Sequence, residues 1–296
     1  MSTTTNQVPN NNNEVLLAEE KLRASDGDLQ QEHPTNTTNG EAGSGCPFAH
    51  SSTSSSTRDE EAMPYQYIPL RMGGRGGTHM VSEASRALID NEVTLDDLKT
   101  MTGAFYELAF QDQTLDKLIR SHEDPHGNRF AKWIHQKLSG SNVWDMDRRN
   151  RDKTPVQVAG GRTAVVHDRS SAHAAAWYSP KRPREEVGRH FNLYECRVWM
   201  RLHFYAMRKT GIMEKSPSFA DYYVRFIAHF VAVYERSAPM FARDSLRWSE
   251  NPANVEKYID DGRIMTDVLG RGYSDSTRDL PESELYDDDW PYYVAQ

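Results

Sequence analysis

The sequence predicts an all-α protein flanked by segments of a different composition. Between about residues 81 and 270, apolar residues recur at helical three- and four-residue spacing in several separate stretches. Capping residues precede these stretches, and glycine or proline follows them. No alternation of apolar and polar residues with a period of two stands out, so we expect no strands in this part of the chain.

The two ends of the chain are polar and acidic. Residues 1–62 contain the runs NNNN and SSTSSST and carry ten acidic residues against three basic ones. Such a segment cannot bury enough apolar surface to offset the chain entropy lost on folding. We therefore expect residues 1–80 to form a disordered or loosely wrapped extension. Residues 271–296 hold seven acidic and two basic residues and are expected to form an acidic tail.

The first helices are expected at residues 82–93 and 94–110. Thr94 is a typical N-cap, because its hydroxyl can accept a hydrogen bond from the first turn and acidic residues follow it. Residues on one face of the second helix then recur at three–four spacing: Leu98, Met101, Phe105, Leu108 and Ala109. Asp112 and Gln113 mark a corner after this helix.

The remaining helices are expected at residues 128–138, 168–178, 193–209, 219–236 and 253–269. Gly211 ends the third of these, and Pro239 is expected to kink an extension of the fourth. The polar stretch at about residues 141–165 is expected to be an inserted loop. The helical domain thus spans residues 81–270, with its last helix forming a C-terminal extension.

Several classes of protein are disfavoured by composition. The two cysteines, Cys46 and Cys196, imply no disulfide framework, and the default compartment is the cytoplasm. The N-terminus lacks the pattern of a secretory signal, and no run of about 18 apolar residues predicts a membrane span. Net charge is −8 and no dense basic face stands out, so we expect no nucleic-acid partner. The sequence identifies no protein partner.

Histidines provide the candidate metal ligands. No paired-cysteine zinc pattern, HExxH motif or phosphate-binding loop occurs. His122 and His126 lie four residues apart, but Pro125 argues against their sharing one helical face, which favours solvated loop histidines. Cys46, followed by a proline and close to His50, is a weaker candidate thiolate ligand for haem. His173 and His190 stand on either side of a proline-rich connection that precedes a long aromatic helix.

Two segments resemble the truncated haemoglobins, the short globins in which two pairs of helices enclose a haem. The segment FYELAFQDQTL, residues 105–115, is similar to that family's second helix, where the tyrosine faces bound ligand. The segment FAKWIHQKLSG, residues 130–140, is similar to the family's distal helix, which ends at a glycine pair.

A third segment decides the expected iron ligand. Ser171-Ala172-His173, followed by the stretch GRHF at residues 188–191, resembles the family's proximal step and the start of its next helix. In the family the histidine of the first step binds iron, so the resemblance implies that His173 is the ligand. His190, which directly precedes the aromatic helix, is the runner-up, and His167 is a further alternative.

The resemblance implies a globin-like two-over-two helical sandwich that binds haem b and a diatomic gas. Oxygen binding is the expected function, with nitric oxide dioxygenation as a secondary activity. The expected haem-contacting residues are Phe105, Tyr106, His126, Phe130 and Trp133. A packed helical domain can enclose such a flat apolar group and present one neutral imidazole to its iron.

Three departures from the family pattern support an alternative, a globin-like interaction module without haem. Leu118 and Ile119 stand where the family has an aromatic pair that braces the haem. Ser139 replaces one glycine of the pair that ends the distal helix. The insertion at about residues 141–165 is longer than the family's usual connection.

Overall fold

The computed structural model describes residues 65–73, 78–150, 153–158, 162–167 and 172–285. The predicted N-terminal extension up to residue 64, with Cys46 and His50, lies outside the described residues. So does the acidic tail from residue 286 onward. Helices dominate the described residues, which confirms the all-α class.

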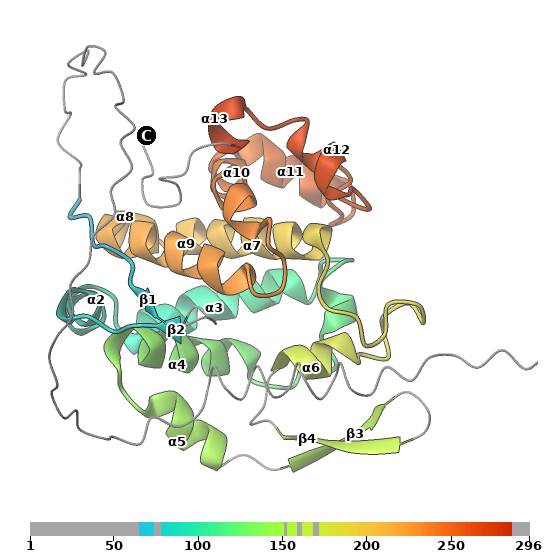
Figure 1. Cartoon of the computed structure of the whole chain (residues 1–296), viewed down its shortest axis with the longest axis horizontal. Coiled ribbons are helices and arrows are strands. Elements are labelled where there is room, and N and C mark those ends of the chain that lie inside the picture. Colours follow the sequence, from blue (N-terminus) through green and yellow to red (C-terminus); the bar gives the residue numbers. More distant parts are fainter. Residues whose placement is uncertain (1–64, 74–77, 151–152, 159–161, 168–171, 286–296) are drawn as a thin grey trace, which may run out of the picture.

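The elements are named in chain order, as in Figure 1. The first half comprises strands β1 (Met72–Gly73) and β2 (Thr78–His79), helix α2 (Glu83–Ala87), the π-helical turn η1 (Leu88–Glu92), α3 (Leu95–Ala109), the 3-10 turn η2 (Asp116–Leu118), α4 (His126–Ser139) and α5 (Val143–Arg149). The second half comprises β3 (Lys153–Val158), β4 (Arg162–His167), α6 (Ala172–Trp177), α7 (Leu193–Lys209), α8 (Ile212–Lys215), α9 (Pro217–Val231), α10 (Ala238–Glu250), α11 (Pro252–Asp260), α12 (Tyr273–Thr277) and α13 (Glu282–Leu285).

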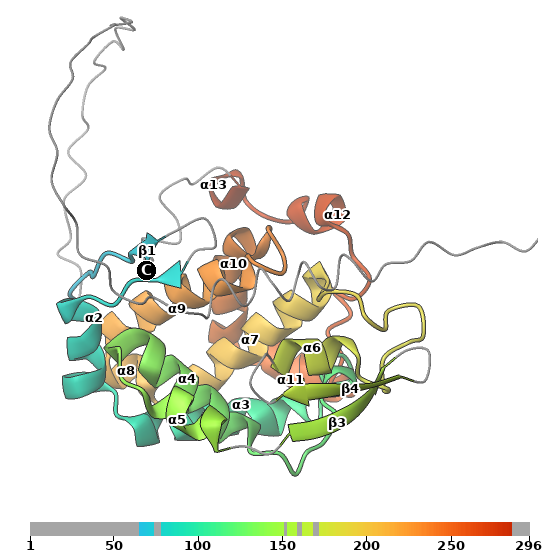
Figure 2. The same ribbon diagram turned by 60° about the horizontal axis from the view of Figure 1, so that its bottom comes forward.

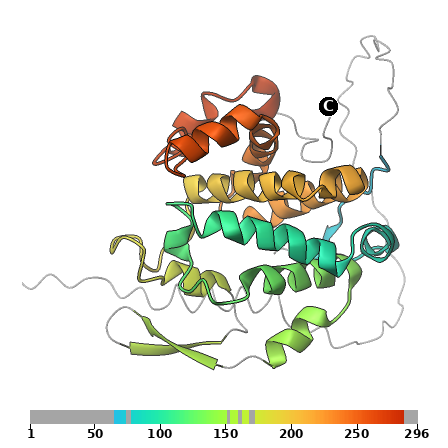
Figure 3. The same cartoon turned by 180° about the vertical axis from the view of Figure 1, so that it is seen from behind.

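Two layers of helices form the body of the molecule. Helices α3 and α4 pack together in one layer, and α7 and α9 lie across them in the other (Figures 1 and 3). Helix α10 packs on the far side of α7 and α9 and carries the C-terminal helices with it. Helix α6 lies beside the N-terminal end of α4 (Figures 1 and 3), and the hairpin β3–β4 projects next to it (Figure 2).

Local sequence signals place α3 and bring it against α4. Thr94 caps α3 as predicted, since its hydroxyl accepts the Asp97 N–H and the Asp97 carboxylate accepts the Thr94 N–H. A Cβ on Gly127 of α4 would lie 3.0 Å from the backbone nitrogen of Gly103 of α3, so only glycine allows this crossing. The Thr102 hydroxyl also donates to the Gly127 carbonyl at 2.7 Å.

The corner after α3 is built around a buried carboxylate. Asp112 accepts the backbone N–H groups of Thr114 and Leu115 at 2.8 and 2.7 Å and the hydroxyl of Tyr258 at 2.8 Å. Tyr258 belongs to α11, so this one side chain joins the corner to the C-terminal helices. Burial raises the pKa of the Asp112 carboxyl, and these three donors oppose that shift.

Replacing Asp112 with alanine is expected to lower the free energy of unfolding by about 2–4 kcal/mol. Three buried donors would lose their acceptor, and an unpaired buried donor costs about 1–3 kcal/mol. Urea unfolding measures the loss. The control is Asp96→Ala, which removes an 89% exposed side chain paired only with Lys99 and should cost under about 1 kcal/mol. Equal losses in the two variants would contradict this role for Asp112.

The expected inserted loop contains structure that the sequence analysis missed. Helix α5 begins at Val143, and β3 pairs antiparallel with β4 so that Lys153 lies opposite His167 and Val158 opposite Arg162. A second short pair joins β1 to β2. The expectation that the helical domain has no strands was therefore wrong, although both pairs are two-stranded and lie outside the helical layers.

Two helix boundaries also differ from the expectation. Helix α9 ends at Val231, and Pro239 does not kink it but stands in the first turn of the separate helix α10. Proline is favoured there because the first-turn N–H has no partner within the helix. Helix α11 ends at Asp260 rather than near residue 269, and α12 and α13 lie in the expected acidic tail. Helix α7 has the predicted bounds, and Gly211 follows it with a φ of 71°.

The segment before α2 is fixed to α9 by a buried ion pair. The side chains of Arg225 and Asp221, one turn apart on α9, are 0% and 3% exposed. Arg225 also donates to the Ile68 carbonyl at 2.9 Å, and the Tyr67 ring lies 4.6 Å from its guanidinium carbon. Among the described residues, no helix is long and apolar enough to cross a membrane.

Candidate functional site

The two leading candidate iron ligands lie in one cluster of rings, which we call the α6 group. Its members are His173, Trp177, His190, Phe191 and Tyr234. Their ring centroids are 4.2–6.0 Å apart in the contacting pairs that define the cluster. The connection between α6 and α7 therefore folds back, so that His173 and Trp177 of α6 contact Phe191 and His190 beyond its prolines.

Within the α6 group, His173 and His190 have different surroundings. His173 is partly buried, and its Nδ1 lies 2.5 Å from the Tyr234 hydroxyl. His190 is exposed and stacks flat on Trp177, at 4.2 Å and 9°. A hydrogen bond at one ring nitrogen orients an imidazole so that the other can bind a metal. Of the two, His173 is the histidine whose ring is oriented by a hydrogen bond.

Two arginines hold the α6 group in position. Arg182 is 5% exposed and donates to the Arg189 carbonyl at 2.7 Å and to the Glu195 carboxylate at 3.1 Å, which ties the proline-rich connection to the start of α7. Arg120 donates to the Tyr178 carbonyl at 2.8 Å and to that of Ala175 at 3.2 Å. The contacts of Arg182 fold the connection back on itself, and those of Arg120 fix the end of α6.

A second group of rings lines the layer formed by α3 and α4, and we call it the α3–α4 group. Its members are Tyr106, His126, Phe130, Trp133 and Trp199, the last contributed by α7. His126 stacks on Tyr106 at 5.2 Å and 23°, and Phe130 packs against both Trp133 and Trp199. Each of the five is only partly buried, although each comes from a helix that contributes to the core.

The predicted haem-contacting residues divide between this group and the core. Phe105 is 1% exposed and packs on Trp199 and His203, so it is a core residue. The other four belong to the α3–α4 group. His126 was expected at a corner disrupted by Pro125, but it is the first residue of α4. Its Nε2 lies 2.9 Å from the Ser121 carbonyl.

His122 does not join His126 in a metal site. It stacks on Phe110 at 4.3 Å, and its Nε2 lies 2.5 Å from the Asp116 carboxylate. Within the described part of the chain, no group of three or more His, Cys, Asp or Glu side chains could hold a metal ion. A single axial histidine would not form such a group, so this absence does not bear on His173.

Tyr106 is a partly buried tyrosine whose hydroxyl is removed from bulk water. Burial raises the pKa of its hydroxyl to about 12, yet the residue keeps accessible surface. No other described residue makes a hydrogen bond with that hydroxyl. Tyrosines nearby differ, since the Tyr223 hydroxyl lies 2.9 Å from His203 Nε2 and the Tyr258 hydroxyl donates to Asp112. Tyr106 therefore has a donor that a ligand can use.

The end of α9 contacts both groups of rings. Phe230, in its last turn, packs edge-to-face on Trp133 at 4.9 Å. Tyr234, four residues later, packs edge-to-face on His173 at 4.6 Å. The sequence does not indicate Tyr234 as a site residue, because it lies 61 residues from His173 and belongs to no local motif.

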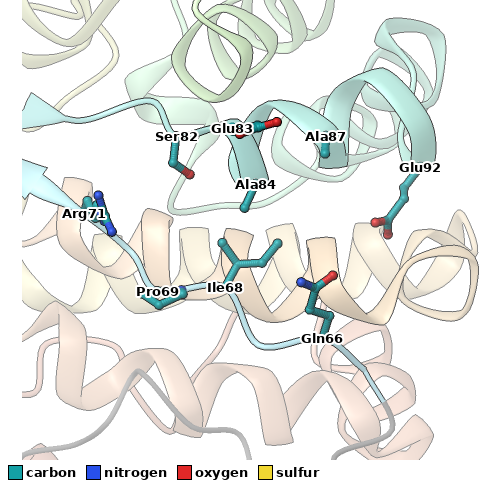
Figure 4. A pocket seen from close by; sticks show the side chains of 9 residues that line it. All are labelled: Gln66, Ile68, Pro69, Arg71, Ser82, Glu83, Ala84, Ala87 and Glu92. Atoms are coloured by element: carbon teal, nitrogen blue, oxygen red, sulfur yellow. The ribbon is translucent and has the colours of Figure 1, made fainter.

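Two surface hollows beside α2 lie away from both groups of rings. One of about 540 Å³ is lined by the segment before β1 and by α2, with Ile68 and Ala84 facing each other across it (Figure 4). The other also borders α2 and includes Val81 and Arg86. The two hollows share Ser82, Glu83 and Ala87. Neither contains a residue of the α6 group or the α3–α4 group.

Comparison with protein-family models, curated proteins and solved structures found no match for this chain.

Proposed function

We propose that this chain is a globin-like haem protein that binds a diatomic gas, with His173 as the iron ligand. The observation that carries the proposal is the hydrogen bond between His173 Nδ1 and the Tyr234 hydroxyl. With Nδ1–H as the donor, Nε2 would be the coordinating nitrogen. Haem, when bound, would supply a ferrous iron that takes oxygen or nitric oxide. Every other role belongs to side chains of this chain.

The surroundings of the two groups of rings fit a flat, apolar cofactor. Four aromatic side chains and one imidazole of the α3–α4 group are partly exposed. Covering their apolar surface with a cofactor would contribute about 25 cal/mol of binding free energy per Å² buried. Helix α6, which carries His173, lies beside the end of α4 at which His126 stands (Figure 1). The two pairs of helices in the body are consistent with a two-over-two sandwich.

Tyr106 would stabilise the bound gas. Its hydroxyl has no acceptor among the described residues, and its raised pKa keeps the proton in place at neutral pH. It would donate that proton in a hydrogen bond to a diatomic ligand that has gained partial negative charge. His126, stacked on the Tyr106 ring, would restrict the orientation of that ring.

Tyr106→Phe is expected to speed ligand release about tenfold, because a hydrogen bond of roughly 1–2 kcal/mol is lost. Stopped-flow measurement of oxygen release from the reduced, haem-loaded protein tests this and the gas-binding function together. The control is Tyr194→Phe, which removes a hydroxyl that donates to Glu186 at 3.3 Å outside the site. Equal release rates in the wild type and Tyr106→Phe would contradict the role of Tyr106, and a reduced protein that binds no gas would contradict the function.

The alternative is an interaction module of the same architecture that takes no haem. One observation favours it: the hollows beside α2 lie near the exposed Met80 and Val81, away from His173. Exposed apolar residues next to a hollow are typical of a surface that binds another protein. A folded wild-type protein that does not take up haem would favour this alternative.

A further inference from the structure

Histidine–tyrosine hydrogen bonds recur in the described part of the chain, and they do not all use the same ring nitrogen. In two buried pairs the nitrogen is Nε2: His79 with Tyr222 at 2.6 Å, and His203 with Tyr223 at 2.9 Å. In the pair of His173 and Tyr234 it is Nδ1, at 2.5 Å. A histidine held at Nδ1 directs Nε2 away from its partner, as a metal ligand requires.

The Tyr234 hydroxyl is fixed by the packing of its ring. That ring stands edge-to-face on His173 at 4.6 Å and 80°, and it also contacts Phe191 at 5.6 Å and Trp177 at 5.9 Å. The Tyr234 N–H donates to the Val231 carbonyl at 2.9 Å, which places Tyr234 in the turn that directly follows α9. Contacts with Phe191 and Trp177, besides the one with His173, therefore hold the ring that carries the hydroxyl.

We propose that Tyr234 is a positioning residue for the iron ligand, an inference that rests on the proposed haem-binding function. Its hydroxyl oxygen accepts the Nδ1–H of His173. This selects the tautomer whose lone pair is on Nε2, and it sets the plane of the ring. A partner at Nδ1 also makes Nε2 more basic and so strengthens its bond to a metal.

The opposite arrangement, in which the tyrosine donates to a bare Nδ1, would place the proton on Nε2 and prevent coordination. The two arrangements predict different tautomers of His173, which can be distinguished without haem. Nitrogen chemical shifts of the haem-free protein at neutral pH should show His173 protonated at Nδ1. In Tyr234→Phe, the form protonated at Nε2 should increase.

The variant Tyr234→Phe keeps the ring contacts and removes only the hydroxyl. We expect its haem affinity to fall about 10- to 100-fold, the usual effect of losing a partner of a metal-binding histidine. We also expect its iron–histidine stretching band in the reduced protein to move to lower frequency. The matched control is Tyr222→Phe, which breaks the hydrogen bond to His79 and should change neither quantity.

The outcomes separate this inference from the proposed function. Haem binding by the wild type with an unchanged affinity and stretching band in Tyr234→Phe would overturn the role of Tyr234 alone. So would a His173 that is protonated at Nε2 in the haem-free wild type. A folded wild type that binds no haem would overturn the proposed function, and the role of Tyr234 with it. Lower affinity and a shifted band in Tyr234→Phe but not in Tyr222→Phe would support the inference.

Discussion

His173→Gly is expected to lower the affinity for haem by at least about 100-fold, and added imidazole is expected to restore it. Outer partners of metal ligands alone contribute about 10- to 100-fold, so the ligand itself should contribute more. Imidazole can occupy the space of the missing side chain and supply the same nitrogen. Haem titration followed by absorption, with and without imidazole, measures both effects. Circular dichroism shows whether the variant remains helical, since glycine within α6 costs about 1 kcal/mol.

The control for this experiment is His190→Gly. His190 is exposed and stacks on Trp177, so its loss should leave haem affinity within the range of the wild type. Loss of haem in His190→Gly with retention in His173→Gly would transfer the ligand role to His190. Retention of haem in both variants would exclude both histidines as the ligand and leave His167 of β4 as the alternative.

Arg225→Met is expected to lower the free energy of unfolding by about 3–5 kcal/mol. The substitution leaves the Asp221 carboxylate buried without its cation, and an uncompensated buried charge carries a cost of this size. It also removes the donor to the Ile68 carbonyl, so the segment before α2 should be released from α9. Urea unfolding measures the stability, and limited proteolysis after Arg71 measures the release.

The double variant Asp221→Leu, Arg225→Met separates the buried charge from the lost contacts. Replacing both members of a buried ion pair with apolar residues is often neutral, so the double variant should be more stable than Arg225→Met alone. A double variant that is less stable than the single one would contradict the account. So would a single variant that loses under about 1 kcal/mol.

The parts of the fold that follow from neighbouring residues could be predicted from the sequence. The N-cap at Thr94 and the bounds of α7 depend on side chains within one turn of each helix end, and both predictions are confirmed. Pro239 was misinterpreted because proline is compatible both with a kink and with a first helical turn. The choice between the two depends on where α9 ends.

The hairpin β3–β4 lies where the sequence predicts a loop, because polar residues dominate the stretch around it. Its strands do contain a signal, since valines occur at residues 156, 158, 165 and 166 and β-branched residues favour strands. Helix formation on both sides made an inserted loop the simpler interpretation. Lys153 pairs with His167, 14 residues later, and such a strand pairing leaves no signal at helical three- or four-residue spacing.

The candidate site could be predicted only in part. The order of motifs in the sequence indicates His173 and Tyr106 as candidates. It does not indicate that Tyr234 bonds to His173, or that Tyr106 is partly buried. Tyr234 reaches His173 from the end of α9, and Arg120 reaches the end of α6 from beyond η2. Such contacts depend on how the helices pack. Phe105 is 1% exposed, whereas its neighbour Tyr106 keeps accessible surface, and this difference also depends on how α3 packs.

Titration of the full-length, haem-free protein with haem tests the central claim most directly. The account predicts uptake of one haem per chain, with the absorption spectrum of a histidine-ligated iron that is lost in His173→Gly and regained with imidazole. A wild-type protein that is helical by circular dichroism and takes up no haem would contradict it.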